Sequence, residues 1–598
     1  MDRFLSRVGD SLMAQSSTRR QFFKRSAIFL SIPAVGALLT ACGSSNKSTT
    51  TSTTTSSGTG STATTSSVAA ASPTQADVIP TIAVNSNSST PTASGSGSAG
   101  TPKQGGDMVV VGHQELAGLS PNDTGPGDQW VMITQIHNAL LEQDENFVLQ
   151  PTLAKTFEAG ADGMSYTFKL VDGAKFHDGT VFSSADVKYT YTFYSDASNG
   201  SVIASYFDNM DTVDSSDPAT VVVKMKAPNA AFATLGATTF IVQSKYHAQV
   251  GEKTYRTKPI GTGPFKLKEF ISADHTTVEA FPDHFRGAPH LNTFTQKLVA
   301  EPSVRTIALE TGQADSSVWT LLAQDDIKLN KETDKFTSFT SVSTAVNHFP
   351  INNTLPFFAD KSCRQAVMYA IDRQKVIDTV FQGAAVIATS NLAPNLTAWY
   401  NPNVTKYAYD VTKSKSLLDA AGWAPGSDGI RAKNGARFSF TCAVISGDSA
   451  RQPEAVLVQQ YLKAVGIEMN IVQQPATQIL QNLPLGKLDS SLFNWTYGGG
   501  SGEPDASDTL NSTAGDNFNS YKNPQMDTLL AQGLAQVDLT KRKPIYDQIQ
   551  VIVADDVPFI YMMYWNWFNH FSKRVQGLPK AALNGSQLYN KAYQWWFS

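Results

Sequence analysis

The sequence lacks the residue patterns that most often carry catalysis. It contains no Gly-x-Ser-x-Gly, His-Glu-x-x-His or Cys-x-x-Cys segment, the signatures of serine hydrolases, zinc peptidases and thiol redox sites. The segment Gly261–Pro264 is rich in glycine, but no Lys-Ser or Lys-Thr pair follows it to hold a phosphate. The nine histidines are scattered, and the closest pair, His284 and His290, has neither i, i+4 spacing nor a neighbouring cysteine. We therefore expect no enzyme activity, no cofactor and no metal.

Reversible binding is the chemistry that the aromatic residues suggest. Trp495 and Tyr497 precede a run of glycines, Gly498–Gly500 and Gly502, which is typical of an exposed loop at the end of a strand. A pocket for a small solute needs aromatic walls and a few placed polar groups. Trp495 and Tyr497 are therefore of the residue types that such a wall would use, next to a loop expected to be exposed. Tryptophan is also common in cores, so a core position stays an alternative for Trp495.

Length and composition bound the architecture. A chain of 598 residues with 41% hydrophobic and 10% aromatic residues exceeds what one core fills, so we expect more than one domain. Lys and Arg number 47 and Asp and Glu 51, for a net charge of −4, and this balance argues against a nucleic-acid partner. Three cysteines are too few for a disulfide scaffold. Cys363 and Cys442 are expected to be buried thiols, with a bridge between them as the alternative.

The first 42 residues are predicted to be an export signal. Residues 18–24 are Thr-Arg-Arg-Gln-Phe-Phe-Lys, and the apolar run from Ala27 to Ala41 that follows is too short to span a bilayer comfortably. A basic region followed by a short apolar region is typical of a secretion signal. The paired arginines indicate the twin-arginine (Tat) route, with ordinary Sec export as the alternative.

The end of this apolar run carries a candidate lipidation site. Leu39-Thr40-Ala41-Cys42 resembles the lipobox of bacterial lipoproteins, in which the cysteine is lipidated and becomes the new N-terminus. The resemblance implies that Cys42 anchors the protein to the outer face of the cytoplasmic membrane. A plain signal peptide with an unrelated cysteine is the alternative. Residues 43–104 are mostly Ser, Thr, Gly, Ala, Pro and Asn, and we expect a disordered tether there.

From Gly105 onward the sequence alternates between strand and helix patterns. Period-two alternation and apolar runs predict strands at residues 108–111, 165–171, 220–225, 467–472 and 557–565. Helical periodicity and capping residues predict helices at residues 183–194, 362–381, 410–421, 453–465 and 541–555. Asp178-Gly179 marks a tight turn. Strands that alternate with helices predict an α/β fold with a mixed sheet covered by helices.

Three charged residues of the helix at 362–381 resemble ligand-binding groups but are not assigned to the site. Arg364, Asp372 and Arg373 lie on one predicted helix, where surface pairing or anchoring of the helix accounts for them.

Several motifs follow one another in a fixed order between Gly105 and the C-terminus. They are Asp162–Leu170, Ala174–Gly179, Pro259–Phe265, Cys363–Ala366, Ala370–Arg373, Leu417–Trp423 and Asn523–Asp527. Each is weak alone. Together and in this order they resemble the extracytoplasmic solute-binding proteins of peptide, dipeptide and nickel ABC transporters, known as family 5.

This resemblance implies a periplasmic-binding-protein fold of type II, with two lobes around a deep ligand cleft and three discontinuous domains. Domain I would comprise residues 105–147, 240–345 and 576–598. Domain II would comprise residues 148–239, and domain III residues 346–575. Two strands that cross between the lobes would form the hinge, and the lobes would close over the solute.

The resemblance also implies a function. A family member captures a solute outside the cell and hands it unaltered to a membrane permease with its ATPase, and we expect a monomer. Trp319, Trp495 and Tyr497 lie where the family approaches its cleft, and His113, which follows the first predicted strand, is a further site candidate. A purely structural histidine is the alternative for His113.

The loop after Trp495 departs from the peptide-binding pattern. Peptide-binding relatives carry an aspartate shortly after this tryptophan, and it pairs with the α-ammonium group of the peptide. Here the corresponding position is glycine, and Glu503 and Asp505, which come later, are the candidate carboxylates to reach the same point. An ammonium buried without a carboxylate is costly, so an oligosaccharide, which stacks on aromatic rings, stands beside an oligopeptide as the solute. An opine-like amine, chelated nickel, a sensor without transport and a membrane-anchored hydrolase also stay open.

Overall fold

The computed structural model describes residues 100–598, apart from 124–126, 202, 319–320, 447, 449, 484–485, 498–501 and 583–584. The predicted export signal, Cys42, nearly all of the tether and Trp319 therefore lie outside the described residues. In the part that is described, no helix combines length with enough apolar character to cross a membrane.

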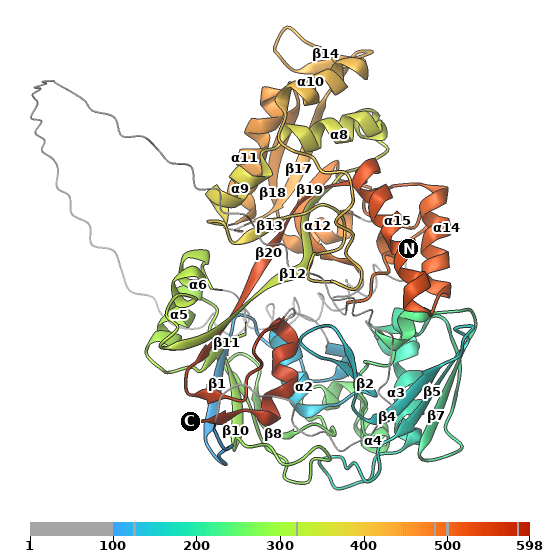
Figure 1. The fold of residues 1–598 in the computed structure, drawn as a ribbon, viewed down its shortest axis with the longest axis vertical. Helices are drawn as coiled ribbons and strands as arrows, with labels where there is room; N and C mark the ends of the chain where they lie inside the picture. The colour runs from blue at the N-terminus through green and yellow to red at the C-terminus, as the bar shows by residue number, and fades with distance from the viewer. Residues whose placement is uncertain are drawn as a thin grey trace, which may run out of the picture. The chain divides into compact units, whose positions relative to one another are not determined.

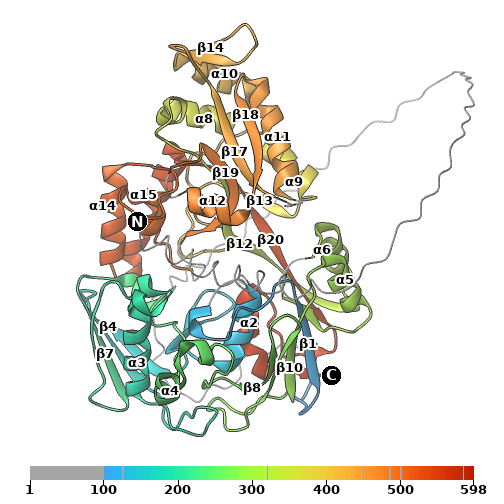
Figure 2. The ribbon, with the colours of Figure 1, turned by 180° about the vertical axis from the view of Figure 1, so that it is seen from behind.

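A mixed sheet of eleven strands runs through the described chain (Figures 1 and 2). Its order is β18-β17-β19-β12-β20-β11-β1-β10-β9-β8, with β13 paired to β20. Its strands are β1 Asp107–Gly112, β8 Phe265–Ile271, β9 His275–Ala280, β10 Thr293–Leu298, β11 Ser316–Ser317, β12 Phe336–Pro350, β13 Ala385–Ile387, β17 Ser439–Ile445, β18 Glu468–Gln474, β19 Ser490–Thr496 and β20 Phe559–Ser572. The predicted strands at 108–111 and 467–472 are confirmed as β1 and β18.

The two longest strands, β12 and β20, pair with each other and join the two halves of this sheet. Their register runs from Phe336 opposite Ser572 to Pro350 opposite Phe559, with a bulge after Val342. Both are rich in aromatic and β-branched residues, which favour extended backbone. The strand predicted at 557–565 is therefore present but longer, because its aromatic pattern continues beyond residue 565.

A separate antiparallel sheet has the order β4-β5-β7-β6. Its strands are β4 Ala154–Ala159, β5 Ser165–Leu170, β6 Met210–Asp214 and β7 Thr220–Met225, and helices α3 Ser184–Ser195 and α4 Ser244–Tyr255 lie next to it (Figure 2). The predicted capping box opens α3, where the backbone N–H of Ser183 donates to Asp186 Oδ2 over 3.0 Å. The predicted turn is also present, and Gly179 there has a φ of +84°.

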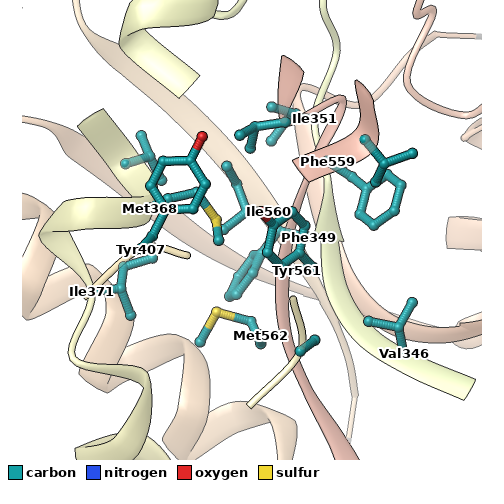
Figure 3. Close-up of a cluster of buried hydrophobic side chains, with 14 of the residues drawn as sticks. Val346, Phe349, Ile351, Met368, Ile371, Tyr407, Phe559, Ile560, Tyr561 and Met562 are labelled. Carbon is teal, nitrogen blue, oxygen red and sulfur yellow. The ribbon is translucent and has the colours of Figure 1, made fainter. Parts of the chain in front are cut away.

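The three largest hydrophobic cores draw on different parts of the chain. The first core takes residues between 108 and 136, 265 and 339, and 571 and 595. The second core takes residues between 140 and 255, and the third takes residues between 346 and 564. Figure 3 shows part of the third core, where side chains of β12 and β20 such as Phe349 and Ile560 lie near Met368. The burial of these side chains is the main force that holds each unit together.

The helix predicted at 362–381 is wrong in one respect, because the structure divides it into two helices. Helix α8 spans Lys361–Ala370 and α9 spans Arg373–Val380. Between them Ile371 is extended, and the Asp372 side chain accepts a hydrogen bond of 2.9 Å from the backbone N–H of Lys375. An aspartate that caps a new helix competes with continuation of the old one, so the apolar periodicity persists across a break.

The two arginines of this region are buried, so the expectation of surface pairing is wrong for them and that of helix anchoring is confirmed. Arg364 donates to the backbone carbonyls of Phe358 and Val557. Arg373 donates to those of Ala388 and Tyr407. The guanidinium groups thus fix loops around α8 and α9.

The other predicted helices are confirmed with small shifts at their ends. They are α10 Val411–Ala420, α11 Arg451–Ala464 and α15 Leu539–Asp556. Further helices are α2 Gly127–Ile136, α5 Pro302–Glu310, α6 Ala323–Leu329, α7 Pro356–Ala359, α12 Ala476–Asn482, α13 Ser507–Leu510 and α14 Pro524–Ala535. Three smaller groups of short strands complete the sheets. β2 Leu141–Gln143 pairs with β3 Leu149–Pro151, and β21 Val575–Gln576 pairs with β22 Trp596–Phe597. β15 Arg431–Lys433 lies between β14 Ala424–Pro425 and β16 Ala436–Arg437 and pairs with both. Cys363 and Cys442 are buried free thiols.

Candidate functional site

The candidate site lies at one edge of the large sheet. Strands β17, β18 and β19 are mutually parallel, so their carboxyl ends at Ile445, Gln474 and Thr496 meet at the same edge. In open α/β sheets ligands bind beyond the carboxyl ends of parallel strands. Strand β12 pairs antiparallel with β19 there and carries the chain toward the other half of the sheet. The predicted aromatic residues leave β19 at this edge.

Trp495 is half-buried at the end of β19. Its ring meets Phe518 edge-on, with ring centroids 4.8 Å apart, and it also contacts Phe493. The indole Nε1 is buried and has no hydrogen-bond partner among the described residues. A buried indole N–H normally finds an acceptor, so this donor is unsatisfied among the described residues.

Tyr497 is buried, in contrast to Trp495. Its ring stacks on Phe559 with centroids 5.4 Å apart and lies near His348. Burial raises the pKa of the Tyr497 hydroxyl well above its usual value. Tyr497 is therefore part of the third core.

A polar cluster that the sequence did not reveal occupies the other side of β19. Asn347 and Asn494 lie opposite each other in β12 and β19, and the Asn347 amide donates to both carboxylate oxygens of Glu454 over 2.8 and 2.7 Å. Arg451 donates to Asn494 Oδ1, and its guanidinium lies 5.0 Å from the ring centre of Trp565. Because Glu454 is fully buried, its pKa rises to about 8.

The sequence contains a pattern that could have identified Glu454 as a buried carboxylate. In α11 it precedes Val458 and Leu462 at helical spacing, so a carboxylate stands in the apolar stripe of an amphipathic helix. A charged residue in that stripe must be paired or neutral.

Glu503 is taken up by an ion pair inside the protein. The carboxylate is 1% exposed and is held by both Nη atoms of Arg542, which is 3% exposed. Glu503 Oε2 also accepts a hydrogen bond of 2.7 Å from the Thr234 hydroxyl. Arg542 in turn donates from Nε to the backbone carbonyl of Gly533 over 2.8 Å. Glu503 therefore has no free oxygen to offer a solute.

The two aspartates after Glu503 differ in exposure. Asp505 is half-buried and accepts a 2.7 Å hydrogen bond from the Ser507 hydroxyl, and its burial raises its pKa to about 6. Asp508, which the sequence analysis missed, is exposed. Dehydration by the surrounding protein, aided by the nearby carboxylates of Asp505 and Asp516, raises the pKa of Asp508 to about 7.

His113 lies apart from these residues. It follows β1, which is separated from β19 by β12, β20 and β11 in the sheet order. Its Nδ1 is 2.9 Å from Asp128 Oδ1, and Asp128 Oδ2 accepts from the backbone N–H of Gln114 over 2.9 Å. The described structure thus brings Trp495, Tyr497, Glu503 and Asp505 into one region and leaves His113 in another. Trp319 lies outside the described residues.

The described residues also show what this site does not hold. No group of three His, Cys, Asp or Glu side chains among them is placed to bind a metal ion. The described part of this region combines the half-buried ring of Trp495 with the hydrogen-bonded side chains of Arg451 and Glu454 and with the carboxylates of Asp505 and Asp508.

Residues 148–518 match the family described as bacterial extracellular solute-binding proteins, family 5. The chain belongs to this family. A family 5 protein binds an extracellular solute, so this chain is a solute-binding protein, and the family resemblance read from its motifs is confirmed.

Two relatives show how far the similarity extends. The oligopeptide-binding protein AppA of Bacillus subtilis is 29% identical over 526 residues, which cover 84% of this chain and 93% of AppA. Protein XP55 of Streptomyces lividans is 30% identical over 455 residues, which cover 74% of this chain and 81% of that protein.

Solved structures show the same fold. The structure of AppA from Bacillus subtilis with a nonapeptide matches with a TM-score of 0.70 at 25% identity, covering 83% of this chain and 100% of AppA. NikZ from Campylobacter jejuni, in complex with Ni(L-His), matches with a TM-score of 0.70 at 24% identity, covering 82% of this chain and 99% of NikZ. Family 5 proteins share a two-lobed α/β fold of periplasmic-binding type II, which confirms the predicted fold class for this chain.

Proposed function

We propose that this protein captures oligopeptides outside the cell and delivers them unaltered to an ABC permease and its ATPase. The observation that carries the proposal is the similarity to AppA, named as an oligopeptide-binding protein, over 93% of its length. AppA with a nonapeptide in place also matches in structure over 83% of this chain. A similarity of this extent covers both halves of the large sheet rather than one module.

The site supports a role in binding. Trp495 would form a wall of the peptide cleft, because its half-buried ring carries an unpartnered indole N–H. Tyr497 would hold this wall in place through its stack on Phe559. A peptide backbone offers carbonyl acceptors at every residue, which suits an indole donor.

Asp508 would supply the charge that the loop after Trp495 lacks. Glu503 is committed to Arg542 and Asp505 is half-buried, whereas Asp508 is exposed. The pKa of Asp508 near 7 would fall when the ammonium group of a peptide approaches, because an adjacent cation favours the ionised carboxylate. An oligosaccharide would gain nothing from this group, and the relatives named above do not favour that alternative.

The placement of the protein on the membrane is part of the same proposal. The twin-arginine segment and Cys42 in its lipobox-like setting support export and a lipid anchor at the outer face of the cytoplasmic membrane, with residues 43–104 as the tether. Three separate cores support a division into three domains, although the second core extends from Leu140 to Tyr255, beyond the bounds 148–239 expected for domain II. The protein would act as a monomer.

Native mass spectrometry of the purified protein, followed by calorimetry with peptide and oligosaccharide panels, tests this function. We expect peptides of several residues to bind at roughly micromolar Kd, or about −8 kcal/mol, because uptake requires release to the permease. Intact peptide must be recovered after incubation. Binding of sugars without peptides, or hydrolysis of the bound peptide, would overturn the proposal.

A further inference from the structure

One hydrogen bond joins two parts of the protein that have separate hydrophobic cores. Thr234 ends the short 3₁₀ helix Ala230–Ala233, which belongs to the second core. Its hydroxyl lies 2.7 Å from Glu503 Oε2, and Glu503 and Arg542 belong to the part of the chain around the third core. Thr234, Glu503 and Arg542 are called the boundary contact below.

A second packing contact lies at the same boundary. Gly163, in the turn between β4 and β5, packs so closely that a Cβ there would lie 3.1 Å from Cγ1 of Val537, between α14 and α15. Figure 1 shows α14 and α15 next to the small sheet that contains β5. The boundary contact is therefore part of an interface and not an isolated bond.

The ion pair of the boundary contact is complete without Thr234. Both carboxylate oxygens of Glu503 are bound by Arg542, whose guanidinium also lies over the rings of Trp399 and Tyr546. Thr234 adds one donor from the other side of the boundary. Because Glu503 is buried and forms an ion pair with Arg542, a hydrogen bond to this pair is of the stronger, charge-assisted kind.

The Thr234 hydroxyl has a choice of two acceptors. Besides Glu503 Oε2 it lies 3.0 Å from the backbone carbonyl of Ala231, on its own side of the boundary. A hydroxyl has one hydrogen to donate, so it satisfies one acceptor at a time. When the two sides of the boundary are apart, the Thr234 hydroxyl donates to the backbone carbonyl of Ala231. When they are together, it donates to the carboxylate of Glu503.

We propose that Thr234 is a positioning residue for solute retention, because its hydroxyl passes from Ala231 to Glu503 when the two lobes close. This inference rests on the proposed function, since retention has meaning only for a protein that closes over a solute. Thr234 touches no solute in this scheme. It sets the fraction of closed molecules, and the apparent affinity scales with that fraction.

We expect a moderate effect, because in the open form the Thr234 hydroxyl keeps a hydrogen bond to the Ala231 carbonyl. Only the difference between that bond and the bond to Glu503 favours the closed form. Removing the hydroxyl should raise the peptide dissociation rate and the Kd about three- to tenfold. The same factor should appear in the ratio of closed to open molecules without ligand, since one equilibrium underlies both.

The chain offers a matched control for this test. Thr238 is also half-buried, and its hydroxyl donates to the backbone carbonyl of Thr234 over 2.8 Å, within the same lobe. T234V and T238V each remove a local hydroxyl bond, but only T234V removes the bond to Glu503. T234S keeps the hydroxyl and should restore wild-type behaviour.

Single-molecule Förster resonance energy transfer in the full chain measures the closure of the two lobes directly. Dyes are attached at K224C and K487C, two exposed positions on opposite sides of the boundary, in a C42S background. A nonapeptide library then gives the dissociation rates. We expect T234V to lower the closed-to-open ratio and to speed release about three- to tenfold, and T238V and T234S to match the parent.

Equal closure and equal release in T234V and T238V would overturn the inference. The failure of the proposed function looks different, because then no variant binds peptide. The ligand-free ratio of closed to open molecules still tests Thr234 in that case.

Discussion

The end of β19 and the loop that follows it differ in how their polar groups are hydrogen-bonded. At Trp495 the indole N–H has no partner among the described residues. At Glu503 both carboxylate oxygens are bound, by Arg542 and by Thr234 from the other side of the lobe boundary. The indole N–H of Trp495 is thus a buried donor without an acceptor among the described residues, whereas the carboxylate of Glu503 is fully used in contacts that hold the fold together. Glu503 therefore differs from Trp495 in that both of its carboxylate oxygens already accept hydrogen bonds from the protein.

The largest effect is expected when the guanidinium group of Arg542, which pairs with Glu503, is removed. Arg542→Ala leaves a buried carboxylate unpaired, and we expect the free energy of unfolding to fall by about 3–5 kcal/mol. Urea unfolding followed by near-ultraviolet circular dichroism measures it. Lys541→Ala is the control, because Lys541 lies next in the chain with its side chain 70% exposed and should change stability by less than about 1 kcal/mol. An Arg542 variant as stable as this control would show that the ion pair is not needed.

Glu454 is a buried glutamate like Glu503, but its carboxylate accepts hydrogen bonds from the amide of Asn347, whereas that of Glu503 pairs with an arginine. Its folded-state pKa of about 8 lies above its usual 4.5, so the folded state binds more protons than the unfolded state between these values. Stability should therefore fall as pH rises from about 4.5 to about 8, by at most about 1.4 kcal/mol per pH unit from this group. Glu454→Gln should lack that part of the slope.

The measurement is the difference in unfolding free energy between wild type and Glu454→Gln at pH 5, 6.5 and 8. Taking the difference removes the slopes of Asp505 and other carboxyl groups. We expect the variant to gain relative to wild type as pH rises. A difference that does not vary with pH would show that Glu454 is ionised throughout.

Trp495→Ala should weaken peptide binding about 10- to 100-fold, because the substitution removes both an aromatic wall of the proposed cleft and a hydrogen-bond donor. Trp495→Phe keeps the packing on Phe518 and removes only the indole N–H, so it should lose less. Calorimetry measures the Kd, and a melting curve checks that the fold persists. Unchanged affinity in Trp495→Ala would remove Trp495 from the site.

The smallest expected effect concerns the charge near the solute. Asp508→Asn should weaken binding of peptides with a free N-terminus about three- to tenfold, and leave N-acetylated peptides unaffected. The acetylated peptide is the internal control, since it differs only in its charge. Equal losses for both peptides would mean that Asp508 acts on the structure of the loop and not on the ammonium group.

Much of the fold was predictable from sequence because local signals and packing agree there. The capping box at Ser183, the strands at 165–171 and 220–225 and the helix after Asp410 all appear as expected. The break at Asp372 was missed because apolar periodicity continues across it. The partners of Arg364 and Arg373 are backbone carbonyls far along the chain, which no local pattern reveals.

The site was predictable only in part, for a related reason. Trp495 and Tyr497 were found through their neighbouring glycines, although Tyr497 is buried behind the wall. The role of Glu503 depends on Arg542 and Thr234, which lie 39 and 269 residues away in sequence. Pairings at such separations arise from the tertiary fold, so residue type alone could not separate Glu503 from a ligand-binding carboxylate.

The central claim is that two lobes close around an oligopeptide and release it unaltered. Small-angle X-ray scattering of the purified protein, with and without the nonapeptide library, tests this closure most directly. The peptide is recovered afterwards and its mass is measured by mass spectrometry. We expect a smaller radius of gyration with peptide present and a recovered peptide of unchanged mass. An identical scattering curve at saturating peptide, or a cleaved peptide, would contradict it.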